Sequence, residues 1–197
     1  DHNPENSAFM EQRLEVLQEK NPDAELRHRW VAYNQISPHL KRALIASEDA
    51  KFLDHEGFDW EGIQTAWEKN LKKGKVVAGG STISQQLAKN LFLSGKRTPW
   101  RKLEEAVITV MMEQMMSKRR IFEIYLNVIE WGNGVFGAEA ASRHYYRKSA
   151  RNLSPAEAAK MAAMVPNPRF YDTHRQDRRL LRKARIIQRR MYYAEYP

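Results

Sequence analysis

The chain has 197 residues, a length that suits one domain or one domain with a small accessory lobe. Its 33 lysines and arginines outnumber its 24 aspartates and glutamates, and the net charge of +9 points to an anionic partner. Such a partner is a nucleic acid, an anionic membrane surface or a phosphorylated substrate. The absence of cysteine excludes a disulfide scaffold, a cysteine-ligated zinc site and a thiol nucleophile. No segment approaches the roughly 18 apolar residues that a membrane-spanning helix needs.

Three predicted helices begin with the same pair of residue types, a serine or threonine followed by proline. Ser37, Thr98 and Ser154 each precede a proline, which places a hydroxyl N-cap before the first helical position. Apolar residues then recur with the helical period, and alternating β-branched runs are absent, so the sequence predicts a mainly helical protein. The predicted helices span about 38–51, 59–73, 82–92, 99–116, 118–129, 137–146, 154–164 and 175–193. Residues 1–36 are polar with one weak amphipathic run, and an irregular stretch is predicted to follow 166–168.

Glu48 is predicted to lie on the apolar stripe of its helix, because Leu44 and Phe52 flank it four residues away on either side. Burial raises the pKa of a carboxyl group, which suits a general base or acid. The plainer interpretation is a boundary residue paired with Lys51 or Arg42, and the helix alone favours it.

Glu105 repeats this pattern, since it shares a helix face with Ile108 and Met112. An ion pair with Arg101 or Lys102 is the safer interpretation of Glu105 by itself. Two carboxylates in partly apolar settings on different helices are nevertheless a weak signal for glycosyl chemistry.

The run from Gly79 to Gln86 is more specific. Its two glycines free the backbone, and the hydroxyl and amide side chains that follow gather at a helix N-terminus, an arrangement that binds anions. Lys89, Arg97 and Arg101 add positive charge nearby. An ordinary capped helix after a flexible loop explains the same run equally well. The arginine-rich segment 175–190 favours a solvated helix face over a lipid-headgroup or nucleic-acid surface.

Five ordered stretches between about residues 36 and 175 resemble the peptidoglycan glycosyltransferases of glycosyltransferase family 51. They are Glu48–Asp59, Gly79–Leu93, Arg101–Asn127, Glu130–Ala141 and Pro166–Pro168. The resemblance implies an all-α fold with a lysozyme-like large lobe and a smaller, membrane-facing jaw lobe. No transpeptidase domain follows the fifth stretch, so the chain resembles the monofunctional members of the family. We expect 1–36 to be a polar linker after a membrane anchor, and 37–197 to be the catalytic domain.

The resemblance implies polymerisation of lipid II into β-1,4-linked glycan strands, with inverting displacement of undecaprenyl pyrophosphate. It assigns the general base to Glu48 and the second catalytic carboxylate to Glu105. No cofactor is required, although a Mg²⁺ or Mn²⁺ ion at Asp49 or Glu105 is an option. The substrate-binding residues that it implies are Asp49, Phe52, His55, Gly80, Ser81, Thr82, Gln86, Lys89, Asn90, Arg97, Arg101, Lys118, Arg119, Asn127 and Asn133.

The implied partners are lipid II, the growing undecaprenyl-linked glycan, the membrane surface and proteins of cell division or elongation, with no nucleic acid. The implied location is the periplasmic face of the bacterial inner membrane, with a single N-terminal anchor. The main alternative is a lytic enzyme that cleaves peptidoglycan on a lysozyme-like fold. A basic nucleic-acid-binding protein would leave the two glutamates without a role, and a non-catalytic scaffold would need a broken first motif.

Overall fold

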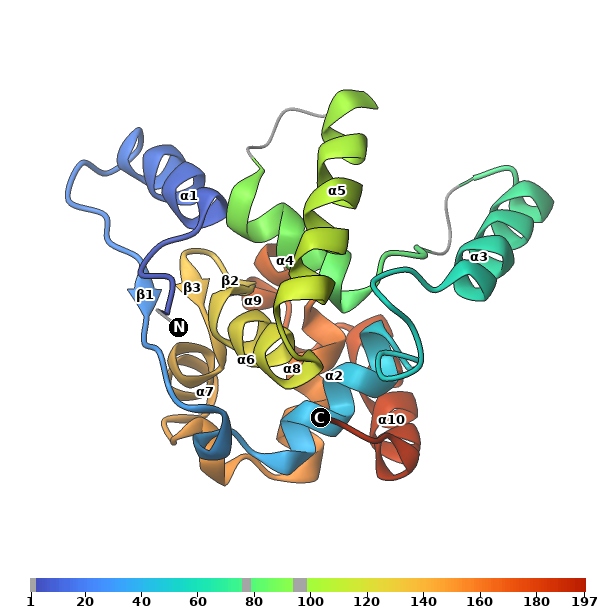
Figure 1. Ribbon diagram of the computed structural model, residues 1–197. Helices are drawn as coiled ribbons and strands as arrows, with labels where there is room; N and C mark the ends of the chain where they lie inside the picture. Colours follow the sequence, from blue (N-terminus) through green and yellow to red (C-terminus); the bar gives the residue numbers. More distant parts are fainter. Residues whose placement is uncertain (1–2, 76–78, 94–98) are drawn as a thin grey trace.

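The computed structural model describes residues 3–75, 79–93 and 99–197, which form a helical bundle, a small sheet and a projecting pair of helices (Figure 1). The elements in the first half are α1 (Ala8–Gln18), β1 (Arg27–His28), α2 (Pro38–Glu48), α3 (Trp60–Lys73), α4 (Ile83–Phe92) and α5 (Pro99–Met115). Those in the second half are α6 (Lys118–Val128), β2 (Glu130–Gly132), β3 (Val135–Phe136), α7 (Ala138–Tyr146), α8 (Pro155–Met164), α9 (Pro168–Thr173) and α10 (Arg178–Arg190). The mainly helical, lysozyme-like fold predicted from the sequence is confirmed.

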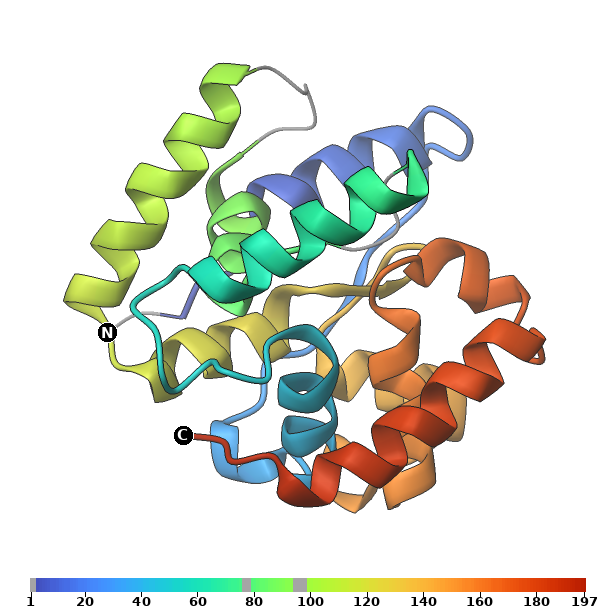
Figure 2. The same ribbon diagram turned by 90° about the vertical axis from the view of Figure 1, so that its right-hand side faces the viewer.

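The core of the bundle is built on α8, which packs against both α2 and α10 (Figure 2). The buried faces of α8 carry small side chains, which let the backbones of neighbouring helices approach closely. These side chains are Ala158, Ala159, Ala162 and Ala163. Leu44 of α2 and Leu180 of α10 are fully buried in the same core. Helix α8 begins at the predicted N-cap Ser154, which forms a capping box because Ser154 and Glu157 bond each other's backbone N–H groups.

A three-stranded sheet with the order β1-β3-β2 lies beside the bundle. Strand β1 pairs parallel to β3, and β2 and β3 form an antiparallel hairpin that turns at Gly134, where φ is 72°. The positive φ explains the glycine, since a side chain there would be strained. Strands of two or three residues are too short to show an alternating pattern, so the sheet could not be predicted from the sequence.

Helices α3 and α5 project from the rest of the molecule, and both views draw them above the bundle of α2, α8 and α10 (Figures 1 and 2). We call this pair, residues 60–73 and 99–115, the α3–α5 lobe. It exposes a set of large apolar side chains: Trp60, Trp67 and Leu71 on α3, and Trp100, Leu103, Val107, Val110, Met111 and Met115 on α5. No helix within the three described ranges is both long enough and apolar enough to span a membrane.

The N-terminal segment packs against the rest of the chain. Helix α1 begins at the N-cap Ser7 and buries Met10 completely. Phe9 packs edge-on against Phe136 of β3, and Arg13 forms an ion pair of 3.0 Å with the buried Glu130. The boundary at residue 36 stays a prediction, but residues 7–18 are part of the packed structure.

Two predicted features are corrected. The stretch after Pro166 is not irregular, because Pro168 occupies the first turn of the short helix α9. The last long helix begins at the N-cap Asp177, whose side chain accepts from two backbone N–H groups, rather than at residue 175. The cap predicted at Thr98 lies outside the described residues.

Candidate active site

Glu48 ends α2 at the boundary between two cavities. The smaller cavity, of about 170 Å³, is lined by polar and small residues of the first two motifs, among them Asp59, Gly79 and Thr82. The larger cavity, of about 480 Å³, extends past Lys89 to Arg169. Glu48 and Ser81 line both cavities, so a group placed in either one can reach the same carboxylate.

Three side chains hold the Glu48 carboxylate. Gln86 Nε2 donates to Glu48 Oε2 at 3.3 Å, and Ser47 Oγ donates to Oε1 at 3.4 Å. Lys183 Nζ of α10 lies 3.9 Å from Oε1. Burial raises the pKa of Glu48 above its ordinary value, while Lys183 and the two hydrogen bonds lower it. The Glu48 side chain is 10% exposed, so most of the predicted burial is present, and the environment of the carboxyl suits proton transfer.

The alternative pairing of Glu48 with Lys51 or Arg42 is wrong. Lys51 pairs with Glu61 instead, and the guanidinium of Arg42 lies over the ring of Tyr196. The cation that lies beside Glu48 is Lys183, which is 135 residues away in the sequence. Lys183 belongs to the arginine-rich segment that the sequence predicts to be a solvated helix face. No local spacing signals a contact of this kind, so the pairing with Lys183 could not be predicted from the sequence.

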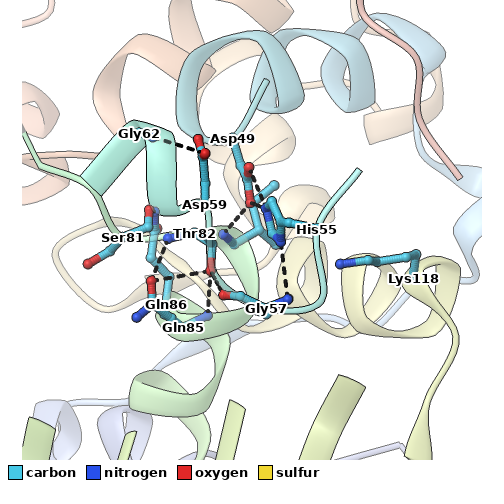
Figure 3. Close-up of polar contacts among 12 residues, drawn as sticks. Asp49, His55, Gly57, Asp59, Gly62, Ser81, Thr82, Gln85, Gln86 and Lys118 are labelled. Carbon is cyan, nitrogen blue, oxygen red and sulfur yellow. Dashed lines mark hydrogen bonds and ion pairs between the residues drawn. The ribbon is translucent and has the colours of Figure 1, made fainter. Parts of the chain in front are cut away.

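Hydrogen bonds from the first motif anchor the N-terminus of α4 (Figure 3). Ile83 N–H donates to Asp49 Oδ2 at 3.0 Å, and the N-cap hydroxyl of Thr82 donates to the Gly57 carbonyl at 2.7 Å. Gly57 N–H donates to His55 Nδ1, so Nε2 carries the ring proton and donates it to Asp49 at 2.9 Å. The structure thus places Asp49, His55 and Thr82 in one network that aligns the first two motifs.

The carboxylates proposed for a divalent ion are already engaged. Both oxygens of Asp49 accept hydrogen bonds, and a carboxylate oxygen of Glu105 is paired with Lys102. Within the described ranges, no three histidine, cysteine, aspartate or glutamate side chains cluster as a metal site would require. A divalent ion at Asp49 or Glu105 stays a prediction.

Glu105 is buried in α5, and the structure does not bring it into either cavity that Glu48 lines. Its partner Lys102 lines a separate cavity of about 260 Å³, together with Gly80 and Ser81. The ion pair that the sequence analysis weighed for Glu105 is present, with Lys102 as the cation. The catalytic role of Glu105 stays a prediction.

Among the predicted substrate-binding residues, Gln86, Lys89 and Asn90 line the larger cavity, and Gly80 and Ser81 line the smaller one. Gly80 passes close to Ile63 of α3, where a Cβ atom would meet the Ile63 Cα at 3.0 Å. The close approach explains why a glycine stands there. These residues are brought together around Glu48.

The predicted cations do not all gather at this place. Arg101 lies half-buried on α5, and Arg97 lies outside the described residues. Lys118 pairs with Glu113 at 2.8 Å, and Figure 3 draws it on the other side of His55 from Gln86. Arg119 lies over the ring of Tyr33 at 4.8 Å. Neither Lys118 nor Arg119 lines the two cavities around Glu48.

Three of the predicted substrate-binding residues lie outside both cavities around Glu48. Phe52 is fully buried in the core. Asn127 is also fully buried, and its side chain bonds the backbone N–H and C=O of Val31. Asn133 is exposed in the β2–β3 turn, where its N–H donates to Asp172. The larger cavity instead has walls that the sequence analysis did not name, from Phe9, Glu130 and residues 165–169.

A helical bundle in which the largely buried Glu48 lies between two polar cavities fits a lysozyme-like glycosyl-transfer domain. A family model described as Transglycosylase matches residues 13–192. The chain is 74% identical over 197 residues to a protein of Methylobacillus flagellatus, and 74% identical over 196 residues to one of Laribacter hongkongensis. Each match covers 100% of this chain and 86% of the relative, and both relatives are named biosynthetic peptidoglycan transglycosylase. The chain belongs to the transglycosylase family.

Proposed function

We propose that this chain is a peptidoglycan glycosyltransferase of the cell envelope, which polymerises lipid II into β-1,4-linked glycan. The observation that carries the proposal is the position of Glu48, buried at the boundary of two cavities that share its carboxylate. A transfer reaction needs this arrangement, because two large substrates must meet at one proton-accepting group. The names of the relatives support the choice of peptidoglycan.

In the proposed reaction, Glu48 accepts the proton of the acceptor's GlcNAc 4-hydroxyl. The oxygen of that hydroxyl attacks C1 of the donor MurNAc, and the bond from C1 to the undecaprenyl pyrophosphate oxygen breaks. A single displacement inverts the α-linked donor to a β-linked product. The raised pKa of Glu48 brings its basicity closer to neutral pH, which favours proton acceptance in the transition state.

The leaving group is a pyrophosphate, which needs charge neutralisation rather than a proton. Lys89 in the wall of the larger cavity is proposed to supply this charge, and Arg97 and Arg101 are assigned to the same site by the resemblance. The ion pair of Glu105 with Lys102 gives Glu105 a proposed role in orienting the cations of the lobe.

The α3–α5 lobe supports a membrane-surface location for the reaction. Its exposed tryptophan, leucine, valine and methionine side chains form an apolar surface of a kind that soluble monomers rarely carry. We propose that this lobe rests on the periplasmic face of the inner membrane, where the undecaprenyl chains of both substrates lie. The basic residues of the second motif would then face the pyrophosphates near the headgroups.

The test is incubation of the protein with purified lipid II, followed by separation of the products. A high-molecular-weight glycan that lysozyme digests, with release of undecaprenyl pyrophosphate, is the expected result. Shortening of preformed glycan strands without polymer from lipid II would overturn the proposal in favour of the lytic alternative. The raised pKa of Glu48 also suits the acid of a lytic enzyme, so the products decide between the two.

A further inference from the structure

Tyr125 is a buried residue for which the reaction above has no use. It lies on α6 and is fully buried, yet its hydroxyl points at the site rather than at another part of the core. Tyr125 Oη donates to Gln86 Oε1 at 2.9 Å. Within the described part of the chain, Gln86 Oε1 is the hydrogen-bond partner found for this hydroxyl.

The other end of the Gln86 amide faces acceptors. Its Nε2 donates to Glu48 Oε2 at 3.3 Å and to the Ser81 carbonyl at 3.4 Å. An ionised carboxylate and a carbonyl can only accept, so the NH₂ group has to face them. The reversed amide would set Gln86 Oε1 against two other acceptors and leave Tyr125 facing the NH₂ group. The network therefore defines a single amide orientation, and the Tyr125 hydroxyl completes it.

We infer that Tyr125 is a positioning residue, which holds the Gln86 side chain in the orientation that presents its NH₂ group to Glu48. This inference rests on the proposed function and adds to it a residue that does not touch substrate. Tyr125 acts on Glu48 only through Gln86, while Gln86 also lines the larger cavity. The hydroxyl of a buried tyrosine suits this task because it donates one hydrogen bond in a fixed direction.

Removal of this hydroxyl leaves Gln86 Oε1 without its protein donor, and the amide is then free to rotate away from Glu48. We expect Tyr125→Phe to lower turnover at saturating lipid II by about five- to tenfold, with KM changed by less than about twofold. The matched control is Tyr145→Phe on α7. Its hydroxyl is also buried and lies within hydrogen-bond distance of the Trp131 carbonyl (2.7 Å) and of Asp172 Oδ1 (3.0 Å), and neither partner contacts Glu48. This control should lose folding stability like Tyr125→Phe but keep its turnover.

A second comparison separates positioning from general damage. In a Gln86→Met background, where no amide remains to be oriented, Tyr125→Phe should change turnover by less than about twofold. A full five- to tenfold loss in that background would overturn the inference, because Tyr125 would then act by another route. An equal loss of turnover in Tyr145→Phe would overturn it as well.

A readout without substrate keeps this inference distinct from the proposed function. The side-chain amide signals of Gln86, assigned by their disappearance in Gln86→Met, should shift or broaden in the NMR spectrum of Tyr125→Phe and stay unchanged in Tyr145→Phe. Unchanged Gln86 signals in Tyr125→Phe would overturn the positioning role. Failure of the unsubstituted protein to polymerise lipid II would instead overturn the proposed function and leave the amide result standing.

Discussion

Helices α6 and α5 have similar apolar spacing but opposite surroundings. Helix α6 buries Ile121, Ile124 and Tyr125 in the bundle, whereas α5 leaves Leu103, Val107 and Val110 exposed in the α3–α5 lobe. Both sets recur every three or four residues, which is the period of one helix face. The period thus predicts that a helix forms and which face is apolar, but not what covers that face.

The candidate site lies where these two regions meet. The bundle supplies Glu48 and Lys183, held in place by buried helices. The segment from Gly79 to Thr82, which leads from the α3–α5 lobe into α4, supplies the facing wall of the smaller cavity. A rigid bundle beside an exposed apolar lobe suits an enzyme whose base must be fixed while its substrates are anchored elsewhere.

The largest expected effect comes from the carboxylate that the bundle fixes. Glu48→Gln should reduce the rate of lipid II polymerisation by about a hundredfold or more, because the amide cannot accept the proton of the attacking hydroxyl. The measurement is the initial rate of polymer formation. Glu61→Gln removes an exposed carboxylate from the α3–α5 lobe and serves as the control. Retention of activity within tenfold in Glu48→Gln would remove Glu48 as the base.

The next largest effect is on folding stability, and it should differ between the bundle and the α3–α5 lobe. Leu44→Ala opens a cavity in the bundle and should lower the free energy of unfolding by about 2–5 kcal/mol. Leu71→Ala removes the same atoms from an exposed position of the lobe, and it should change the free energy of unfolding by less than about 0.5 kcal/mol. Urea unfolding of both variants measures the difference. Equal destabilisation would show that the lobe buries Leu71 against the protein in solution.

The exposed apolar side chains of the α3–α5 lobe should contribute to membrane binding rather than to folding stability. A double variant, Trp67→Ser with Leu71→Ser, should bind anionic lipid vesicles at least about tenfold more weakly, since it removes exposed apolar area from α3. Vesicle co-sedimentation measures this affinity. The control, Gln64→Ser, changes an exposed polar residue of the same helix. Binding that stays unchanged in the double variant would exclude α3 from the membrane contact.

The smallest expected effect is a shift in the pH profile. In the proposed reaction Glu48 can accept a proton only when it is ionised, so the rate should fall as pH drops through its raised pKa. Lys183 lowers that pKa by its positive charge. Lys183→Met should therefore move the acidic limb of the rate profile to higher pH by about half a unit. An unmoved limb, with folding intact, would mean that Lys183 does not influence Glu48 during turnover.

Local features of the fold were predictable wherever the controlling residues are close in sequence. The caps predicted at Ser37 and Ser154 are confirmed, because each cap bonds a backbone group two or three residues away. Helix α9 was not predicted because prolines at 166 and 168 are typical of irregular backbone. In the structure Pro168 occupies the first turn of this helix. The contacts of α1 with Phe136 and Glu130 were not predictable, since they join segments more than a hundred residues apart.

The same limit applies to the site. The burial of Glu48 followed from Leu44 and Phe52 on the same helix face, whereas its partners Gln86 and Lys183 come from other helices. The identities of Asp49 and His55 pointed to the site, but only the structure shows that they bond each other and the start of α4.

The sequence by itself determined the positions of the helices from α2 to α8 and of α10, the helical period of their apolar residues, the excess of positive charge and the presence of a glutamate on an apolar stripe. The tertiary structure decided which faces are covered, that Lys183 rather than Lys51 or Arg42 pairs with Glu48, and that Tyr125 reaches Gln86. The physical reason is range. Capping and helical periodicity act within about four residues, while burial and cross-chain contacts depend on which distant segments pack together.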